Sequence, residues 1–272
     1  MNLDDGFPAG IYSRLYRCED CKDITNPDGV FNFINGAEFA SGAKLPVTIP
    51  VGHFGDVLKA KVWVVLTNPK GDRTDSLVGL SVDQFNVARR SQIKDEDIKS
   101  IFHLQQNYVK KQKTKWHPFF LPFAELLEGI KVSSQPISFE SGDVCFVDAI
   151  KCPTQKAWMG FVMTNDGKRV WDNCLRIRNK YLEKQLEIHQ PKIVLFCGTS
   201  GLIKAEKRGT KVTESQTFSR KLKLTTRHVY SEGRLKQISI DFSNTKFKLL
   251  PKNELRLLRK FISDSINVSV TS

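Results

Sequence analysis

The chain has 272 residues, enough for one large domain or two small ones, and its 40% hydrophobic and 26% charged residues are typical of a folded globular protein. No apolar run approaches the roughly 20 residues of a membrane span and no signal peptide begins the sequence, so we expect a cytoplasmic protein without membrane contact. The net charge of +13 favours a polyanionic partner, most simply nucleic acid, with a generally basic protein as the alternative, and no segment indicates an obligate protein partner.

A pair of cysteines, Cys18 and Cys21, lies near the N-terminus. Thiolates at this spacing on a turn can chelate one metal centre, but two further ligands are needed. In a reducing cytosol we expect the six cysteines to be free or metal-bound rather than paired in disulfides. Residues 25–60 are rich in Gly, Pro and Asn, which predicts a long irregular segment.

Four apolar runs predict buried strands, at residues 61–67, 144–150, 192–197 and 236–242. Helical periodicity is found over residues 82–111, 175–188 and 253–262, and the basic stretch 204–235 predicts a helix tail followed by short β structure. The central strand, loop, helix and strand over residues 143–198 imply parallel pairing in a covered sheet.

The sequence therefore predicts an α/β fold, a three-layer α/β/α sandwich with a central four-stranded parallel sheet. We expect one domain over residues 1–272, with residues 1–60 wrapping the core. Each predicted strand is followed by a polar loop, and in a parallel sheet these loops meet at one edge. The side chains expected to converge there are Asn68, Asp72, Asp148, Thr199, Ser200, Ser243 and Asn244. Ordinary turns between strands and helices are the alternative.

At these loops the chain resembles the uracil-DNA glycosylase superfamily. Residues 66–71 resemble the family's first motif, in the version with Asn before Pro. Residues 146–153 resemble the strand and Lys-Cys-Arg-Pro loop of its iron–sulfur branch, and residues 174–198 resemble that branch's next helix and strand. Residues 241–244 occupy the place of the family's His-Pro-Ser loop.

The resemblance implies a cofactor. Cys18, Cys21, Cys152 and Cys174 are similar in order to the four ligands of a structural 4Fe–4S cluster. Structural zinc in the same four sites is an alternative, and Cys174 as a buried helix residue is another. Cys145 and Cys197 lie in apolar strands and are expected in the core.

The resemblance also implies a monofunctional DNA glycosylase, an enzyme that flips a nucleotide out of the stack and hydrolyses its N-glycosidic bond. Asn68 would place the water, and Asp72 or Asp75 would supply negative charge near the cationic sugar. The expected DNA contacts are Lys70, Thr199, Ser200 and Lys246.

Asp148 departs from the family, which often has Asn at this place. A carboxylate accepts hydrogen bonds and pairs with the exocyclic amino group of cytosine, so we expect a modified cytosine as substrate, as in antiphage members of the superfamily. Ser243 or Asn244 would replace the missing His. The alternatives are a uracil-DNA glycosylase of base-excision repair, a catalytically silent DNA-binding module on the same fold, and a zinc-stabilised α/β nucleotide-binding protein.

Overall fold

The computed structural model describes residues 7–21, 48–67, 82–111, 120–152, 165–176, 178–197, 210–219, 222–229, 236–242 and 251–267. The chain divides into two compact units, each built from three segments. The first unit consists of Met1–Phe54, Thr67–Gln106 and Asp148–His189. The second unit consists of Gly55–Leu66, Asn107–Val147 and Gln190–Ser272.

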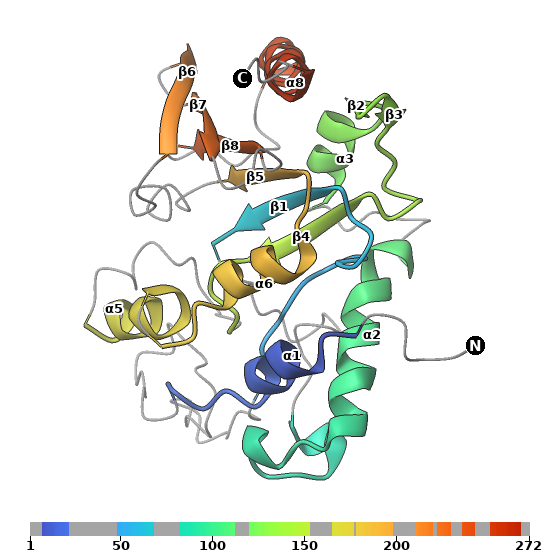
Figure 1. Cartoon of the computed structure of the whole chain (residues 1–272), viewed down its shortest axis with the longest axis vertical. Coiled ribbons are helices and arrows are strands. Elements are labelled where there is room, and N and C mark those ends of the chain that lie inside the picture. Colours follow the sequence, from blue (N-terminus) through green and yellow to red (C-terminus); the bar gives the residue numbers. More distant parts are fainter. Residues whose placement is uncertain are drawn as a thin grey trace. The chain divides into compact units, whose positions relative to one another are not determined.

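A six-stranded sheet forms the centre of the second unit (Figure 1). Its strands are β1 (Val62–Leu66), β4 (Val144–Asp148), β5 (Ile193–Cys197), β6 (Thr210–Ser219), β7 (Leu222–Val229) and β8 (Lys236–Phe242). Their order across the sheet is β4-β1-β5-β8-β7-β6.

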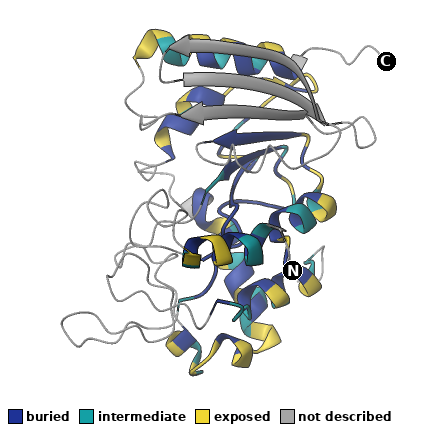
Figure 2. Ribbon diagram, turned by 90° about the vertical axis from the view of Figure 1, so that its left-hand side faces the viewer, coloured by how far each residue is buried: buried dark blue, intermediate teal, exposed yellow. Residues whose placement is uncertain are grey.

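Three of these strands, β1, β5 and β8, are parallel. Val62 pairs with Ile193, and Ile193 pairs in turn with Lys236. The β-branched and aromatic residues of β1 and β5 are almost completely buried (Figure 2), which is typical of parallel strands covered on both faces. The predicted α/β class is therefore confirmed, with these three strands at nearly the predicted positions.

The sheet has six strands rather than the predicted four, and the two additional strands are antiparallel. β7 pairs antiparallel with β8, beginning at Leu222 and Phe242, and β6 pairs antiparallel with β7. Two positions separate β6 from β7, and so short a connection joins only antiparallel neighbours. The basic stretch predicted as short β structure is thus a hairpin that extends the sheet.

The remaining elements of the second unit are short, except for its last helix. They are α3 (Leu121–Leu127), the two-stranded pair β2 (Lys131–Val132) and β3 (Gln135–Pro136), and α8 (Lys252–Asn267). Arg259 on α8 donates hydrogen bonds of 3.0 and 2.9 Å to the carbonyl oxygens of Glu125 and Leu126, and a further one to that of Glu128. These bonds satisfy carbonyl groups at the end of α3 that have no partner within that helix.

The first unit is built from helices and turns. These are α1 (Ala9–Tyr16), η1 (Val82–Phe85), η2 (Arg90–Gln92), α2 (Asp95–Lys111), α5 (Asn165–Trp171), the π-helical turn η3 (Asp172–Arg176) and α6 (Tyr181–His189). Helix α2 begins with three acidic residues, which stabilise a helix N-terminus, and its last residues belong to the second unit. No helix in the described part of the chain is both long and apolar enough to cross a membrane.

The helix predicted over residues 175–188 is interrupted. The π-helical turn η3 ends at Arg176, and Lys180, with a φ of +46°, precedes α6. A residue in this left-handed conformation cannot continue an α-helix. The prediction of one continuous helix is therefore wrong, although its second half coincides with α6.

Candidate metal centre and base-recognition residue

The four predicted cysteine ligands all belong to the first unit. Cys18 and Cys21 lie on the turn that follows α1, Cys152 follows β4, and Cys174 lies in η3. Cys18 is half-buried and the other three are buried, and all four are free thiols. Cys145 and Cys197 are buried in β4 and β5, as expected for core thiols.

The structure brings these four thiols close enough to perturb one another. Burial raises the pKa of the Cys21 thiol to about 12, and the neighbouring Cys152 and Cys18 raise it further. The pKa of Cys174 is also raised, first by burial and then by Cys152, Cys21 and Cys18. The pKa of Cys18 is raised as well, first by burial and then by Cys152. A bound cation at such a group of thiols would stabilise their thiolate forms.

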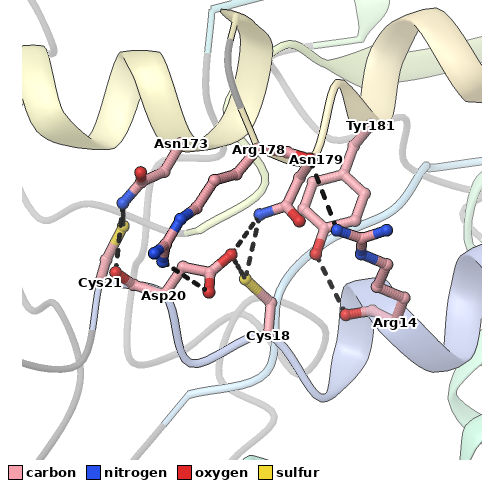
Figure 3. A network of polar contacts seen from close by, with 8 residues as sticks. All are labelled: Arg14, Cys18, Asp20, Cys21, Asn173, Arg178, Asn179 and Tyr181. Carbon is pink, nitrogen blue, oxygen red and sulfur yellow. Dashed lines mark hydrogen bonds and ion pairs between the residues drawn. The ribbon is translucent and has the colours of Figure 1, made fainter.

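Three side chains donate N–H groups to the sulfur atoms. Asn173 Nδ2 lies 3.4 Å from Cys21 Sγ, and Asn179 Nδ2 lies 3.8 Å from Cys18 Sγ (Figure 3). Arg90 Nη1 lies 3.6 Å from Cys152 Sγ. Donors of this kind surround thiolate ligands in metal sites and tune the bound group.

The carboxylate of Asp20 holds the Cys18–Cys21 turn in place (Figure 3). Its Oδ2 accepts a hydrogen bond of 2.6 Å from Asn179, and its Oδ1 lies 3.4 Å from Arg178 Nη1. The backbone oxygen of the same residue accepts a hydrogen bond of 3.1 Å from Asn173. A residue of η3 and two residues of the break before α6 therefore fix the turn that carries two cysteines.

Within the described residues, no three ligand-type side chains are arranged around a position that would hold a metal ion. The four thiols are gathered, but they are not in coordination geometry. The donor set nevertheless fits a 4Fe–4S cluster or a zinc ion, because both take four cysteine thiolates.

Asp148, the predicted base-recognition residue, is the last residue of β4 and is 1% exposed. Its Oδ1 atom has no hydrogen-bond partner among the described residues. Burial raises the pKa of Asp148 to about 7, and the positive charge of Lys151 opposes this rise. Asp148 is therefore a buried carboxyl group that can be neutral or ionised near neutral pH.

Lys151 lies between Asp148 and Cys152 in the sequence and is almost completely buried. Its Nζ donates a hydrogen bond of 2.6 Å to Gln185 Oε1 and one of 3.4 Å to the backbone oxygen of Gly52. The backbone oxygen of Lys151 accepts a hydrogen bond of 2.7 Å from Val51. These bonds fix the backbone between the carboxyl group and the cysteine.

Gly52, which takes part in this buried polar network, is packed against α1. A Cβ atom at this position would lie 2.9 Å from the ring of Tyr12 and 3.2 Å from Tyr16 Oη. The backbone N–H of Gly52 donates to Gln105 Oε1 at 2.9 Å, and Tyr16 Oη donates to the same oxygen at 2.8 Å. Close approach of the backbone to these side chains therefore requires glycine.

Several residues that contact the cysteines were not predicted from the sequence. A buried Arg90 looks like any basic surface residue in the sequence, and Asn173, Asn179 and Asp20 carry no pattern of their own. The available signal was that Asn173 precedes Cys174 and that Asp20 lies inside the Cys18–Cys21 pair, because hydrogen-bonding residues around metal ligands help to orient them.

The remaining predicted site residues lie outside the described part of the chain. They are Asn68, Lys70, Asp72, Asp75, Thr199, Ser200, Ser243, Asn244 and Lys246. Their convergence at one edge of the sheet stays a prediction.

A basic cavity of about 470 Å³ lies in the second unit, between the end of α3 and one side of α8. Its lining residues are Gly129, Ile130, Lys131, Arg256, Arg259, Lys260, Ser263 and Asp264. Lys131, Arg256 and Lys260 are exposed. Four basic side chains around one hollow favour an anionic ligand such as a phosphate group.

Neither the family models nor the curated proteins that were searched gave a match to this sequence.

Proposed function

We propose that the chain is a monofunctional DNA glycosylase that flips a modified cytosine out of DNA and hydrolyses its N-glycosidic bond. The observation that carries this proposal is Asp148, a buried carboxyl group at the end of β4 whose Oδ1 has no partner among the described residues. A buried acceptor without a hydrogen bond costs free energy. A position of this kind is typical of a site that a ligand completes.

The edge of cytosine that normally pairs with guanine matches this carboxyl group. With a pKa near 7, the neutral form of Asp148 is populated at neutral pH. That form has an acceptor oxygen for the exocyclic amino group of cytosine and an O–H donor for its ring N3. The ionised form still accepts a hydrogen bond from the amino group. A substituent on C5 of the base leaves both atoms free, so a modified cytosine can be bound in the same way.

Uracil is the second candidate, because the neutral form of Asp148 could bind it as well. A neutral carboxyl group can turn its donor to the O4 atom of uracil and accept from the ring N3–H. The ionised group cannot donate to O4. Excision of uracil through Asp148 would therefore decline as the pH rises above about 7, whereas recognition of an amino group would persist.

The hydrolytic step in this proposal belongs to residues that the resemblance supplies. Water oxygen bonds to the sugar C1′, the N-glycosidic bond breaks with its electron pair leaving on the base, and the base takes up a proton from the water. Asn68 positions the water, and Asp72 or Asp75 stabilises the cationic sugar. Ser243 or Asn244 contacts the base, while Lys70, Thr199, Ser200 and Lys246 contact DNA phosphates.

Cys18, Cys21, Cys152 and Cys174 hold a 4Fe–4S cluster in this proposal, with zinc as the alternative. The group links the turn after α1, the loop after β4 and η3 as a structural cross-link. The raised pKa values of Cys18, Cys21 and Cys174, to which the neighbouring cysteines contribute, and the N–H donors from Asn173 and Asn179 support this assignment.

We further propose the finer fold, a three-layer α/β/α sandwich whose parallel strands include β4. Two hydrogen bonds support the same direction for β4 and β1. Val62 N donates to Asp143 O at 3.0 Å, and further along both strands Ile150 N donates to Thr67 O at 2.9 Å. A cytoplasmic protein that binds DNA agrees with the net charge of +13 and with the basic cavity.

The test is base release from duplexes that carry 5-methylcytosine, 5-hydroxymethylcytosine, glucosylated 5-hydroxymethylcytosine, cytosine, uracil or hypoxanthine. Abasic sites are quantified by alkaline strand cleavage, and the freed base is identified by mass spectrometry. We expect release of a modified cytosine at pH 7 to 8 and little release of uracil. Asp148→Asn should reverse this preference, because an amide suits the O4 and N3–H of uracil.

Asn68→Ala should abolish the hydrolytic step without affecting DNA binding, and binding is measured in parallel. Abasic sites that vanish while binding is retained are the expected result. Strong uracil release without release from any cytosine derivative would establish the uracil enzyme instead. Binding without base release from any duplex would establish the silent DNA-binding module.

A further inference from the structure

Arg90 is a buried cation that contacts two of the four cysteines, Cys18 and Cys152. It is the first residue of η2 and is 4% exposed. Its Nε donates a hydrogen bond of 2.7 Å to the backbone oxygen of Thr48, and its Nη1 donates one of 2.9 Å to that of Cys18. The same Nη1 lies 3.6 Å from Cys152 Sγ. The guanidinium group therefore joins three separate segments of the first unit.

The charge of Arg90 is not balanced by a carboxylate. Among the described residues, no Asp or Glu forms an ion pair with it, and its Nη2 atom is buried without a hydrogen-bond partner. The partners that it does have are two backbone carbonyls and one sulfur atom. A buried guanidinium group is costly unless an anion or a full set of acceptors surrounds it.

We propose that Arg90 is the buried counter-charge of the four-cysteine metal centre, and that its free Nη2 donates to a thiolate or sulfide of the loaded centre. A 4Fe–4S cluster or a zinc ion with four thiolates carries a net charge of about −2. An adjacent guanidinium group neutralises part of this charge. The inference rests on the proposed metal centre and is independent of which base the protein excises.

Two measurable consequences follow from this position. Loss of the cation removes both an electrostatic partner and an N–H donor from the metal centre, so the metal should dissociate faster. In an iron–sulfur cluster, net charge and hydrogen bonds to sulfur set the reduction potential. Removal of Arg90 should therefore lower the midpoint potential, because positive charge favours the reduced state.

The experiment uses full-length protein purified without oxygen, together with Arg90→Gln, Arg90→Lys and the control Arg89→Gln. Arg89 is the exposed neighbour of Arg90. Iron and zinc contents are measured first, followed by the rate of metal transfer to a chelator and, for iron, the midpoint potential. We expect about 10-fold or faster metal loss in Arg90→Gln, an intermediate rate in Arg90→Lys, and the wild-type rate in Arg89→Gln.

Thermal unfolding of metal-loaded and metal-free protein separates this role from simple packing. Arg90→Gln should lower the melting temperature more in the loaded than in the metal-free protein. If Arg90→Gln does not fold, Arg90→Lys provides the comparison, because it keeps the charge and loses the planar donor group. Equal metal loss and equal potential in the wild type and the folded Arg90 variants would overturn the inference. A wild-type protein that binds neither iron nor zinc would overturn the metal centre together with it, and the base-release assay would still stand.

Discussion

Asn179 Nδ2 lies 2.6 Å from Asp20 Oδ2 and 3.8 Å from Cys18 Sγ, so one amide group holds both the carboxylate and a thiol of the cysteine turn. Arg178, the residue before it, contacts the other oxygen of Asp20 at 3.4 Å. The two contacts differ in exposure, since Asn179 is 1% exposed and the side chain of Arg178 is 62% exposed. They allow a matched comparison.

Asn179→Ala should destabilise the protein by about 1–3 kcal/mol, because it removes a buried hydrogen bond and leaves Asp20 with one partner fewer. Arg178→Ala should cost less than about 1 kcal/mol, because exposed ion pairs contribute little. Urea unfolding of both variants measures the difference. Equal effects of the two substitutions would contradict the assigned role of Asn179.

Asp148 should make the protein less stable as the pH rises. Burial raises its pKa in the folded state to about 7, above the 3.8 of an ordinary Asp, so the folded state binds more protons between these values and the free energy of unfolding falls across this window. Asp148→Asn removes this pH dependence, because an amide does not titrate. Since one pKa unit corresponds to about 1.4 kcal/mol, the free energy of unfolding of the variant, relative to that of the wild type, should be roughly 2–4 kcal/mol higher at pH 8 than at pH 4.

The measurement for Asp148 is the difference in unfolding free energy between variant and wild type from pH 4 to 8. Taking this difference cancels the contribution of the histidines to the pH dependence, because they titrate in both proteins. A difference that does not change with pH would mean that the carboxyl group has an ordinary pKa.

Two glycines provide a test of the packing around α1. Gly52→Ala should destabilise the protein by about 1–3 kcal/mol, because the new Cβ would lie 2.9 Å from the Tyr12 ring in a filled core. Gly10→Ala should be neutral or stabilise by up to about 1 kcal/mol, because Gly10 lies in α1 with nothing within 4 Å of the added methyl group. Thermal unfolding should therefore give melting temperatures that shift in opposite directions, or by clearly different amounts, for the same Gly→Ala change.

The basic cavity should contribute to DNA affinity through phosphate contacts. Arg256→Ala and Lys260→Ala should each weaken binding uniformly across sequences and reduce the slope of log K against log salt by about 1. Lys94→Ala is the control, since Lys94 is an exposed lysine outside the cavity that pairs with Glu96. Fluorescence anisotropy with a labelled duplex at several salt concentrations gives the slopes. Unchanged slopes in both cavity variants would remove this surface from the DNA interface.

The strands could be predicted from the sequence because burial on both faces requires continuous apolar runs, as in Val62–Leu66 and Ile193–Cys197. The grouping of Cys18, Cys21, Cys152 and Cys174 was implied by the family resemblance, and in the structure the other three cysteines all raise the pKa of Cys174. The hairpin β6–β7 was harder to predict, because polar and basic residues give no alternation that assigns it to the central sheet.

The polar surroundings of the cysteines could not be predicted from spacing. Arg90 comes from a different segment than any cysteine, and only tertiary packing places it beside Cys152. The break before α6 depends on the left-handed conformation of Lys180, which propensity disfavours for a lysine. Helix α1 has only eight residues and begins with Ala-Gly, so its periodicity is too short to detect.

The π-helical turn η3 makes the spacing around Cys174 sensitive to chain length. Asn173 and Cys174 are consecutive, and each residue of a π-helix turns the chain by less than the roughly 100° of an α-helical residue. The wider turn sets the direction of the amide that reaches Cys21 and of the thiol that faces the other cysteines. Deletion of one residue from this turn would rotate one of these groups away, so homologous chains should vary in length before α5 rather than inside η3.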